Sequence, residues 1–224
     1  MTMKIYHGSI NIIEKPFYGY GKPYNDYGLG FYCTESLELA KEWAVSYELD
    51  GYANCYELDI SNLKILNLSE KPYTILHWLA LLLKHRTFKS RSPLVEEAKE
   101  YILNKFSIDI SDFDIIIGYR ADDSYFSFAR DFMQGTISYR QLSRALKLGN
   151  LGQQVVLKSM KAFNNLHFIE AINAYSNEWY GKKIERENKA RLDYFDGTKN
   201  KRMKGDVFIH QIIDEEMEAN DERL

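Results

Sequence analysis

The chain is poor in the residues that mark disulfide-rich, zinc-binding and membrane-spanning proteins. Its two cysteines, Cys33 and Cys55, cannot form a disulfide framework or a four-cysteine zinc site. No uninterrupted apolar run approaches the roughly 18–20 residues that cross a bilayer. The first residues also lack the apolar stretch of a secretory signal peptide. These absences predict a soluble, cytoplasmic protein with no membrane partner.

The motifs of the commonest enzyme sites are missing as well. The sequence contains no GxxxxGK[ST] phosphate loop, no GxSxG nucleophile turn and no HExxH zinc motif. Neither Gly-x-Gly sequence, at residues 19–21 or 28–30, opens a helix after a strand, which argues against a dinucleotide-binding Rossmann turn. His77 is expected to be an ordinary core histidine, and the pair Asp122 and Asp123 to start a helix. We therefore expect no metal site.

The composition that remains is that of a globular protein. Hydrophobic residues make up 45% of the 224 residues and charged residues 27%, with a net charge of −3, so wholesale disorder is excluded. Residues 182–204 hold nine Lys or Arg against four Asp or Glu, whereas residues 205–224 hold seven acids against one Arg. A basic stripe of this kind can bind nucleic acid phosphates, but it is more often the solvated face of a helix. The last 25 or so residues are compatible with a loosely attached appendage.

The pattern of apolar residues predicts an α+β fold. Residues 14–29 are rich in turn formers and predict a loop, and strands at both ends of the chain with helices between them argue against alternating βαβ units. Strands are expected at residues 3–7, 30–34, 53–60, 63–68, 113–118, 153–158 and 166–172. Helices are expected at residues 36–49, 73–85, 94–106, 123–134, 139–148 and 175–196. Gly135 is expected to end the helix at 123–134, and Gly149 the helix at 139–148.

Three short pieces of sequence carry a resemblance to a known family. Tyr6-His7-Gly8-Ser9 ends the first strand, the segment GLGFYCT follows at residues 28–34, and Trp43 comes eleven residues after Tyr32. This arrangement resembles the ADP-ribosyltransferase superfamily, in its His–Tyr–Glu branch of poly(ADP-ribose) polymerases and diphtheria-type toxins. The layout also resembles an uncharacterised bacterial family assigned to that superfamily.

The resemblance implies a fold and its division. It implies a split, mixed and antiparallel β core over residues 1–174, with a helix-rich insertion at about residues 72–148. Residues 175–224 would then form a C-terminal helix and a charged tail.

The resemblance also implies a binding site for NAD⁺ as co-substrate. His7 would bind the adenosine ribose, the backbone of Gly8 would hold the nicotinamide carboxamide, and Ser9 completes this motif. Tyr32 and Trp43 would sandwich the nicotinamide ring. Because that ring is cationic, each aromatic face would add about 0.5–2 kcal/mol of attraction.

The third element of the branch, a glutamate, is replaced in this chain. Gln153 aligns with that glutamate and is the expected catalytic position beside His7 and Tyr32. Gln154 is one residue off and would point to the opposite face of the strand. A glutamine accepts a hydrogen bond but brings no charge, and losing such an electrostatic stabiliser costs roughly 10²–10³ in rate. The family's helix serine also falls on Ala40.

Two classes of function follow from these residues. The first is an NAD⁺-dependent mono-ADP-ribosyltransferase acting on a macromolecular acceptor, protein or nucleic acid. By resemblance it would be a bacterial toxin or defence protein, retained in the cytoplasm or delivered to a target cell, with an immunity or antitoxin partner. Acceptor choice would fall to loops 14–27 and 150–153. The alternative is a catalytically impaired NAD-binding or protein-interaction module of the same fold; a helical interaction protein with a fortuitous resemblance also stays open.

Overall fold

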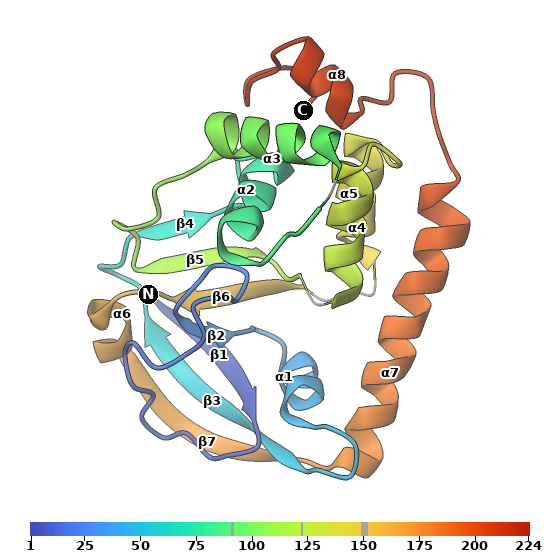
Figure 1. The fold of residues 1–224 in the computed structure, drawn as a ribbon. Helices are drawn as coiled ribbons and strands as arrows, with labels where there is room; N and C mark the ends of the chain where they lie inside the picture. Colours follow the sequence, from blue (N-terminus) through green and yellow to red (C-terminus); the bar gives the residue numbers. More distant parts are fainter. Residues whose placement is uncertain (91, 122, 149–151) are drawn as a thin grey trace.

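The computed structural model describes residues 1–90, 92–121, 123–148 and 152–224, and these form two β-sheets with several helices gathered at the top of Figure 1 and a long helix along its right-hand side. The predicted α+β class is confirmed. In the first sheet β3 lies between β1 and β7, and all pairings are antiparallel. The second sheet has the order β2-β6-β5-β4 and is mixed, because β4 and β5 run parallel. The strands are β1 (Thr2–Ser9), β2 (Phe31–Cys33), β3 (Gly51–Asp59), β4 (Ile65–Asn67), β5 (Ile115–Tyr119), β6 (Gln153–Leu157) and β7 (Leu166–Ala174).

One backbone pairing joins the two sheets. The Tyr6 N–H donates to the Thr34 carbonyl at 2.8 Å, and the Thr34 N–H donates to the Tyr6 carbonyl at 2.9 Å. The space between the sheets is filled by an apolar cluster that includes Ile5, Tyr56 and Leu157. The junction therefore places the end of β1 directly beside β2, where the motif residues lie.

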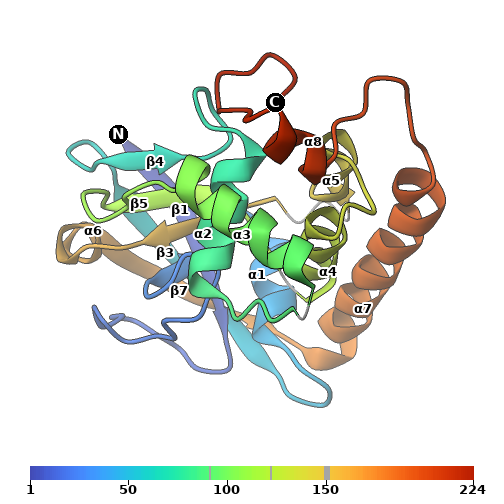
Figure 2. The ribbon, with the colours of Figure 1, turned by 45° about the horizontal axis from the view of Figure 1, so that its top comes forward.

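Helices α2 and α3 lie over the strands in Figure 2 and cover the other face of the second sheet, whereas α1 packs against β1 and β3 of the first sheet. Helix α2 is apolar almost all round, as expected of a helix buried between a sheet and other helices. The segment 72–148 is not purely helical, because β5 is an inner strand of the second sheet. The helices are α1 (Leu37–Ala44), α2 (Ile75–His85), α3 (Pro93–Phe106), α4 (Asp123–Met133), α5 (Tyr139–Ala145), α6 (Met160–Asn164), α7 (Ser176–Asp193) and α8 (Ile209–Asp214), with a π-helical turn η2 (Tyr194–Lys199) after α7.

Most predicted elements are present, with differences at their ends. Ser36 caps α1 as expected, its hydroxyl accepting from the Leu39 N–H at 3.3 Å, but the helix ends at Ala44 instead of residue 49. Tyr47, inside the range predicted to be helical, lies beyond the helix end and is exposed. The short helices α6 and α8 were not predicted. Three predictions fall wholly or partly outside the described residues: the helix end at Gly149, the role of Asp122 and the acceptor loop 150–153, of which residues 150 and 151 are not described.

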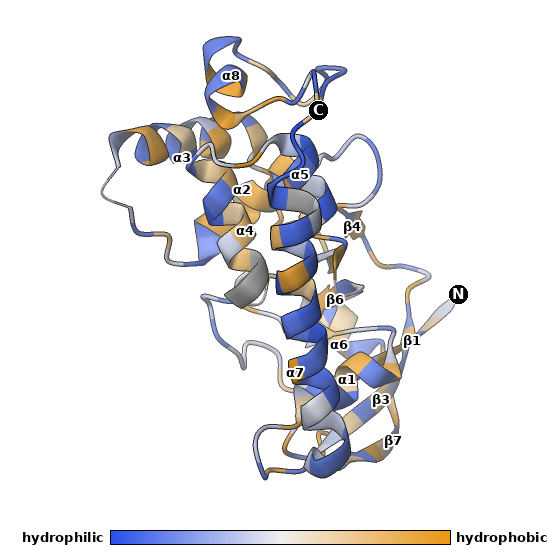
Figure 3. Ribbon diagram, turned by 90° about the vertical axis from the view of Figure 1, so that its right-hand side faces the viewer, coloured by the Kyte–Doolittle hydropathy of each residue, from blue (hydrophilic) through white to orange (hydrophobic). Residues whose placement is uncertain are grey.

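The basic stretch after residue 182 lies largely on helix α7, which runs along the side of the molecule and is mostly hydrophilic (Figure 3). Trp179 and Ala190 are its buried residues, and Arg186 pairs with Glu42 of α1 at 2.6 Å. The expected surface helix is confirmed. No helix in the described ranges combines the length and apolarity needed to cross a bilayer.

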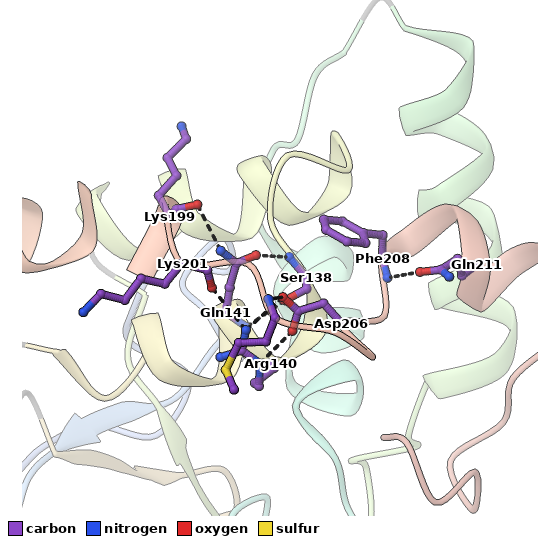
Figure 4. Close-up of polar contacts among 9 residues, drawn as sticks. Ser138, Arg140, Gln141, Lys199, Lys201, Asp206, Phe208 and Gln211 are labelled. Atoms are coloured by element: carbon purple, nitrogen blue, oxygen red, sulfur yellow. Dashed lines mark hydrogen bonds and ion pairs between the residues drawn. The ribbon is translucent and has the colours of Figure 1, made fainter. Parts of the chain in front are cut away.

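The C-terminal segment is packed against the helical layer. Figure 4 shows Arg140 and Gln141 of α5 in contact with it: the Arg140 guanidinium binds both oxygens of Asp206 at 2.6 and 2.8 Å, and the Gln141 amide donates to the Lys199 carbonyl at 3.0 Å. Ile212 of α8 is fully buried in the main core. The loosely attached appendage inferred from charge is therefore wrong, because apolar residues spaced among the acids reach the core.

Replacing Ile212 tests this packing. Ile212→Ala should lower the free energy of unfolding by about 2–4 kcal/mol, because it leaves a cavity in the core. Ile213→Ala, at a half-buried neighbour in the same helix, should cost about half of that or less. Urea unfolding measures both, and equal, negligible losses would mean that the segment is detached in solution.

Candidate functional site

A cleft of about 730 Å³ opens where the end of β1, the loop of residues 10–30, α1 and the ends of α2 and β5 meet. Four residues of the motif line it: His7, Gly8, Tyr32 and Trp43. Its volume lies in the range of small-molecule sites. The fold thus brings together residues from three separate pieces of sequence.

His7 lies at the end of β1, and its ring is held from two sides. It stacks on Phe31 with centroids 4.3 Å apart, and its Nδ1 is 2.7 Å from the Tyr32 carbonyl oxygen. A carbonyl only accepts, so Nδ1 carries the proton. Burial lowers the pKa of His7, which favours the neutral ring. Nε2 is therefore left as a hydrogen-bond acceptor for a ligand.

Tyr32 offers the cleft its ring and not its hydroxyl. The hydroxyl donates to the Gly28 carbonyl at 2.6 Å and accepts from the Tyr27 N–H at 3.1 Å. Burial raises the pKa of this phenol well above its usual range. Gly28 has a φ of +71°, and a Cβ there would meet the His85 ring, so this turn requires glycine. The ring is fixed in place by the loop that precedes its own strand.

Trp43 of α1 is half-buried, and one face of its ring is covered. The Arg120 guanidinium lies 4.4 Å from the Trp43 ring centroid. The indole Nε1 is buried with no hydrogen-bond partner among the described residues. A ligand ring was expected to stack between Tyr32 and Trp43, but the Arg120 guanidinium already covers one face of the indole. The spacing of residues in the sequence does not reveal this contact.

Gly8 is required by helix packing. A Cβ at this position would collide with the Ala40 carbonyl oxygen and lie 2.8 Å from the Ala44 nitrogen. The absence of a side chain lets α1 lie directly on β1. Packing of α1 against β1 therefore explains why position 8 is glycine, whereas the sequence motif predicts that the Gly8 backbone holds a ligand. Ala40 itself is fully buried and does not line the cleft.

Ser9 does not line the cleft but supports its wall. Its hydroxyl donates to the Asn11 carbonyl at 2.5 Å and accepts from the Asn54 amide at 3.3 Å. Asn54, fully buried on β3, also donates to the Asn11 carbonyl and accepts from the Ile13 N–H at 2.8 Å. Asn54 fixes the start of the loop beside the cleft, and an isolated asparagine in a strand gave no sequence signal for this role.

The structure places Gln154 at the cleft instead of Gln153. Tyr32 of β2 pairs with Val156 of β6, so Tyr32, Val156 and Gln154 share one face of the second sheet. Gln154 lines the cleft and is only 6% exposed, and its Oε1 has no hydrogen-bond partner in the described part of the chain. Gln153 lies on the opposite face, where its amide donates to the Ser69 hydroxyl. The expected alternation was right, but the face assigned to Gln153 is corrected.

A buried charged group that the sequence did not suggest forms the far wall. Asp26 is 6% exposed and accepts from the Arg86 guanidinium at 3.0 Å and from the Ala121 N–H at 2.8 Å. Burial raises the pKa of Asp26, and these partners oppose that shift. Arg86 caps α2 and also donates to the Ala121 carbonyl at 2.5 Å. These residues are far apart in sequence and belong to no motif, so only the fold brings them together.

The cleft combines groups that suit one class of ligand. Tyr32 provides a flat ring, His7 Nε2 is an acceptor for a hydroxyl group, and Arg86 and Arg120 provide positive charge. The Gln154 amide forms part of the wall, with its Oε1 buried and unpartnered among the described residues. Such a set fits an anionic molecule with a planar ring and hydroxyl groups, which describes a nucleotide. No group of three metal-ligating side chains occurs within the described ranges.

The sequence model of one family, described as "Protein of unknown function (DUF3990)", matches residues 3–168, which is well over half of the chain. The match contains every residue of the cleft. It bears out the expected likeness to a family of unknown function. Neither the curated proteins nor the solved structures include a match to the chain.

A methyl group added at Gly8 tests the contact between β1 and α1. Gly8→Ala should destabilise the protein by about 1–3 kcal/mol, because backbone atoms of α1 must move away. Gly181→Ala, in open space on α7, should instead stabilise by about 0.5–1 kcal/mol. Thermal or urea unfolding gives both signs, and a neutral Gly8→Ala would contradict the close packing.

The buried state of His7 predicts a pH dependence of stability. Its pKa is lowered in the fold, so the unfolded chain binds the proton more readily below pH about 6.5, and stability is lost as the pH falls from there. His7→Gln should reduce this loss, because it removes the group whose pKa the fold lowers. Burial raises the pKa values of Asp26 and Glu42, so these two groups add stability as the pH falls, opposite to His7. The quantity to measure is therefore the difference in unfolding free energy between His7→Gln and the parent protein at each pH. Parallel pH profiles for parent and His7→Gln would refute the buried neutral ring.

Proposed function

The chain belongs to the DUF3990 family, and we propose that its cleft binds NAD⁺ and transfers ADP-ribose from it to a macromolecular acceptor. One observation carries the proposal: His7, Gly8, Tyr32 and Trp43, the residues of the ADP-ribosyltransferase-like motif, line a single cleft. A chance likeness of three short segments gives no reason for their side chains to converge.

The groups that line the cleft fit the parts of NAD⁺. The ribose hydroxyls need acceptors, which His7 Nε2 and the buried, unpartnered Gln154 Oε1 supply. The diphosphate needs positive charge, which Arg86 and Arg120 supply. An unsatisfied buried polar atom costs free energy, and a ligand hydroxyl at Gln154 would remove that cost.

The reaction breaks the bond between ribose C1′ and the nicotinamide nitrogen. The electron pair of that bond leaves with nicotinamide, which becomes neutral, while the acceptor forms a bond to C1′ and releases a proton. Positive charge develops on the ribose in the transition state, as in glycoside hydrolysis. Gln154 would hold a ribose hydroxyl there without a charge of its own, so we expect turnover about 10²–10³ below that of a carboxylate-bearing site.

The acceptor is proposed to be a macromolecule because of the surface beside the cleft. The loop of residues 10–30 exposes several large apolar side chains, among them Phe17, Tyr20 and Tyr24, and Tyr20 also lines the cleft. Large apolar side chains exposed along one loop beside the cleft suit contact with a macromolecular acceptor. The resemblance adds the setting of a bacterial toxin or defence protein with an immunity partner.

A second candidate function is an NAD⁺-binding module without turnover. It is favoured by the uncharged Gln154 in place of a carboxylate. Incubation with labelled NAD⁺ separates the two. Release of nicotinamide that is lost in His7→Ala and Tyr32→Ala supports the transferase, while tight binding without release supports the module. A melting temperature that excess NAD⁺ does not raise would contradict both.

The two adjacent glutamines allow a matched test. Gln154→Glu should raise the rate of nicotinamide release by about tenfold or more, because a carboxylate stabilises the positive charge that develops on the ribose. Gln153→Glu, one residue away on the opposite face, should leave the rate unchanged. Gln154→Leu, which buries no charge, should lower the rate and guards against a Glu variant that fails to fold. A rise in Gln153→Glu instead would refute the register of β6.

A further inference from the structure

A second cavity, of about 370 Å³, lies along the same loop of residues 10–30 as the cleft, and Gly30 lines both. Its other walls come from the end of α2, from the segment that precedes β5, and from Lys158 and α6 after β6. We call it the Lys158 pocket. Its volume is at the lower end of the range for small-molecule sites, so it suits a ligand smaller than a nucleotide.

The half-buried ammonium group of Lys158 is held by backbone carbonyls and not by an anion. Nζ donates to the Tyr27 carbonyl at 2.6 Å and to the Leu29 carbonyl, and Leu29 also lines the pocket. An ammonium carries three N–H groups, so one donor is left after these two bonds. Burial lowers the pKa of Lys158 to about 8, and no carboxylate among the described residues opposes that shift.

The other charged groups around the pocket leave this positive charge unmatched. Lys84 and Asp109 both line the pocket, and with Lys158 they give the lining residues a net charge of 2 − 1 = +1. The pKa of Asp109 is lowered by hydrogen bonds from Ser111 and by the charge of Lys84, so Asp109 is ionised and offsets Lys84. Burial and the charge of Lys158 lower the pKa of nearby His85, which is therefore neutral and supplies no anion.

The remaining walls of the pocket are aromatic. Tyr18, Phe113 and Phe163 line it, and the Tyr18 and Phe163 rings meet edge to face with centroids 5.6 Å apart. Tyr18 is half-exposed, so part of its ring is open to a ligand. Aromatic side chains in this arrangement favour a further flat ring.

We propose that the Lys158 pocket binds a small molecule that carries one carboxylate and an aromatic ring, with the carboxylate on the Lys158 ammonium and the ring against Tyr18 and Phe163. A buried charge without a counter-ion costs free energy, and a bound carboxylate removes that cost. A single negative charge also matches the net charge of the lining residues. The inference does not depend on the proposed function, because its charged and aromatic groups lie outside the cleft.

Calorimetric titration with phenylacetate and its neutral analogue phenylacetamide tests the proposal. Phenylacetate should bind the parent protein, and phenylacetamide should bind about tenfold more weakly or worse, because it has the same shape without the charge. Lys158→Met keeps the length of the side chain and should weaken phenylacetate by about tenfold or more. Tyr18→Ala removes one aromatic wall at an exposed position and should weaken it about two- to fivefold.

Lys22→Met is the matched control, since it removes a positive charge from the cleft at an exposed residue, and it should leave phenylacetate binding unchanged. Because Lys158 also holds the loop, thermal unfolding first shows whether Lys158→Met is folded; if it is not, Tyr18→Ala and the comparison with phenylacetamide decide. No binding at millimolar concentration, equal binding of acid and amide, or full affinity in a folded Lys158→Met would overturn the proposal. Loss of binding in Lys22→Met but not in Lys158→Met would place the anion in the cleft and would also overturn it, while NAD⁺ binding would stand.

Discussion

The site depends on the single pairing between Tyr6 and Thr34 that joins the two sheets. Two reciprocal backbone hydrogen bonds set the end of β1 against β2, and the next residue, His7, reaches the Tyr32 carbonyl. That contact fixes the protonated nitrogen of His7 and leaves the other as an acceptor. The glycine at position 8 then lets α1 approach β1, which carries Trp43 to the same cleft. The remaining walls are arranged around this junction.

The cleft keeps polar groups that a merely structural core would satisfy or replace. Gln154 Oε1 and Trp43 Nε1 are buried and lack partners among the described residues. Each such atom costs stability, and a ligand that supplied a hydrogen-bond partner would remove that cost.

The sequence allowed much of the fold to be predicted, because helical and strand periodicities are local. The long surface helix α7, the apolar helix α2 and the helix that begins after Ser36 all follow from residue patterns. The docking of the C-terminal segment was missed because its acids dominate the composition. Its few apolar residues, such as Ile212, decide the outcome through contacts with residues far away in the chain.

What the sequence by itself determined is the identity of the motif residues and the alternation of side chains along each strand, since both depend only on neighbouring positions. What the tertiary structure decided is which alternate face meets the cleft. The pairing of Val156 with Tyr32 selected Gln154 over Gln153. The structure also brought Asp26, Arg86 and Arg120 together from three distant segments. Register and convergence arise from long-range backbone pairing and burial, and no local pattern of residues encodes them.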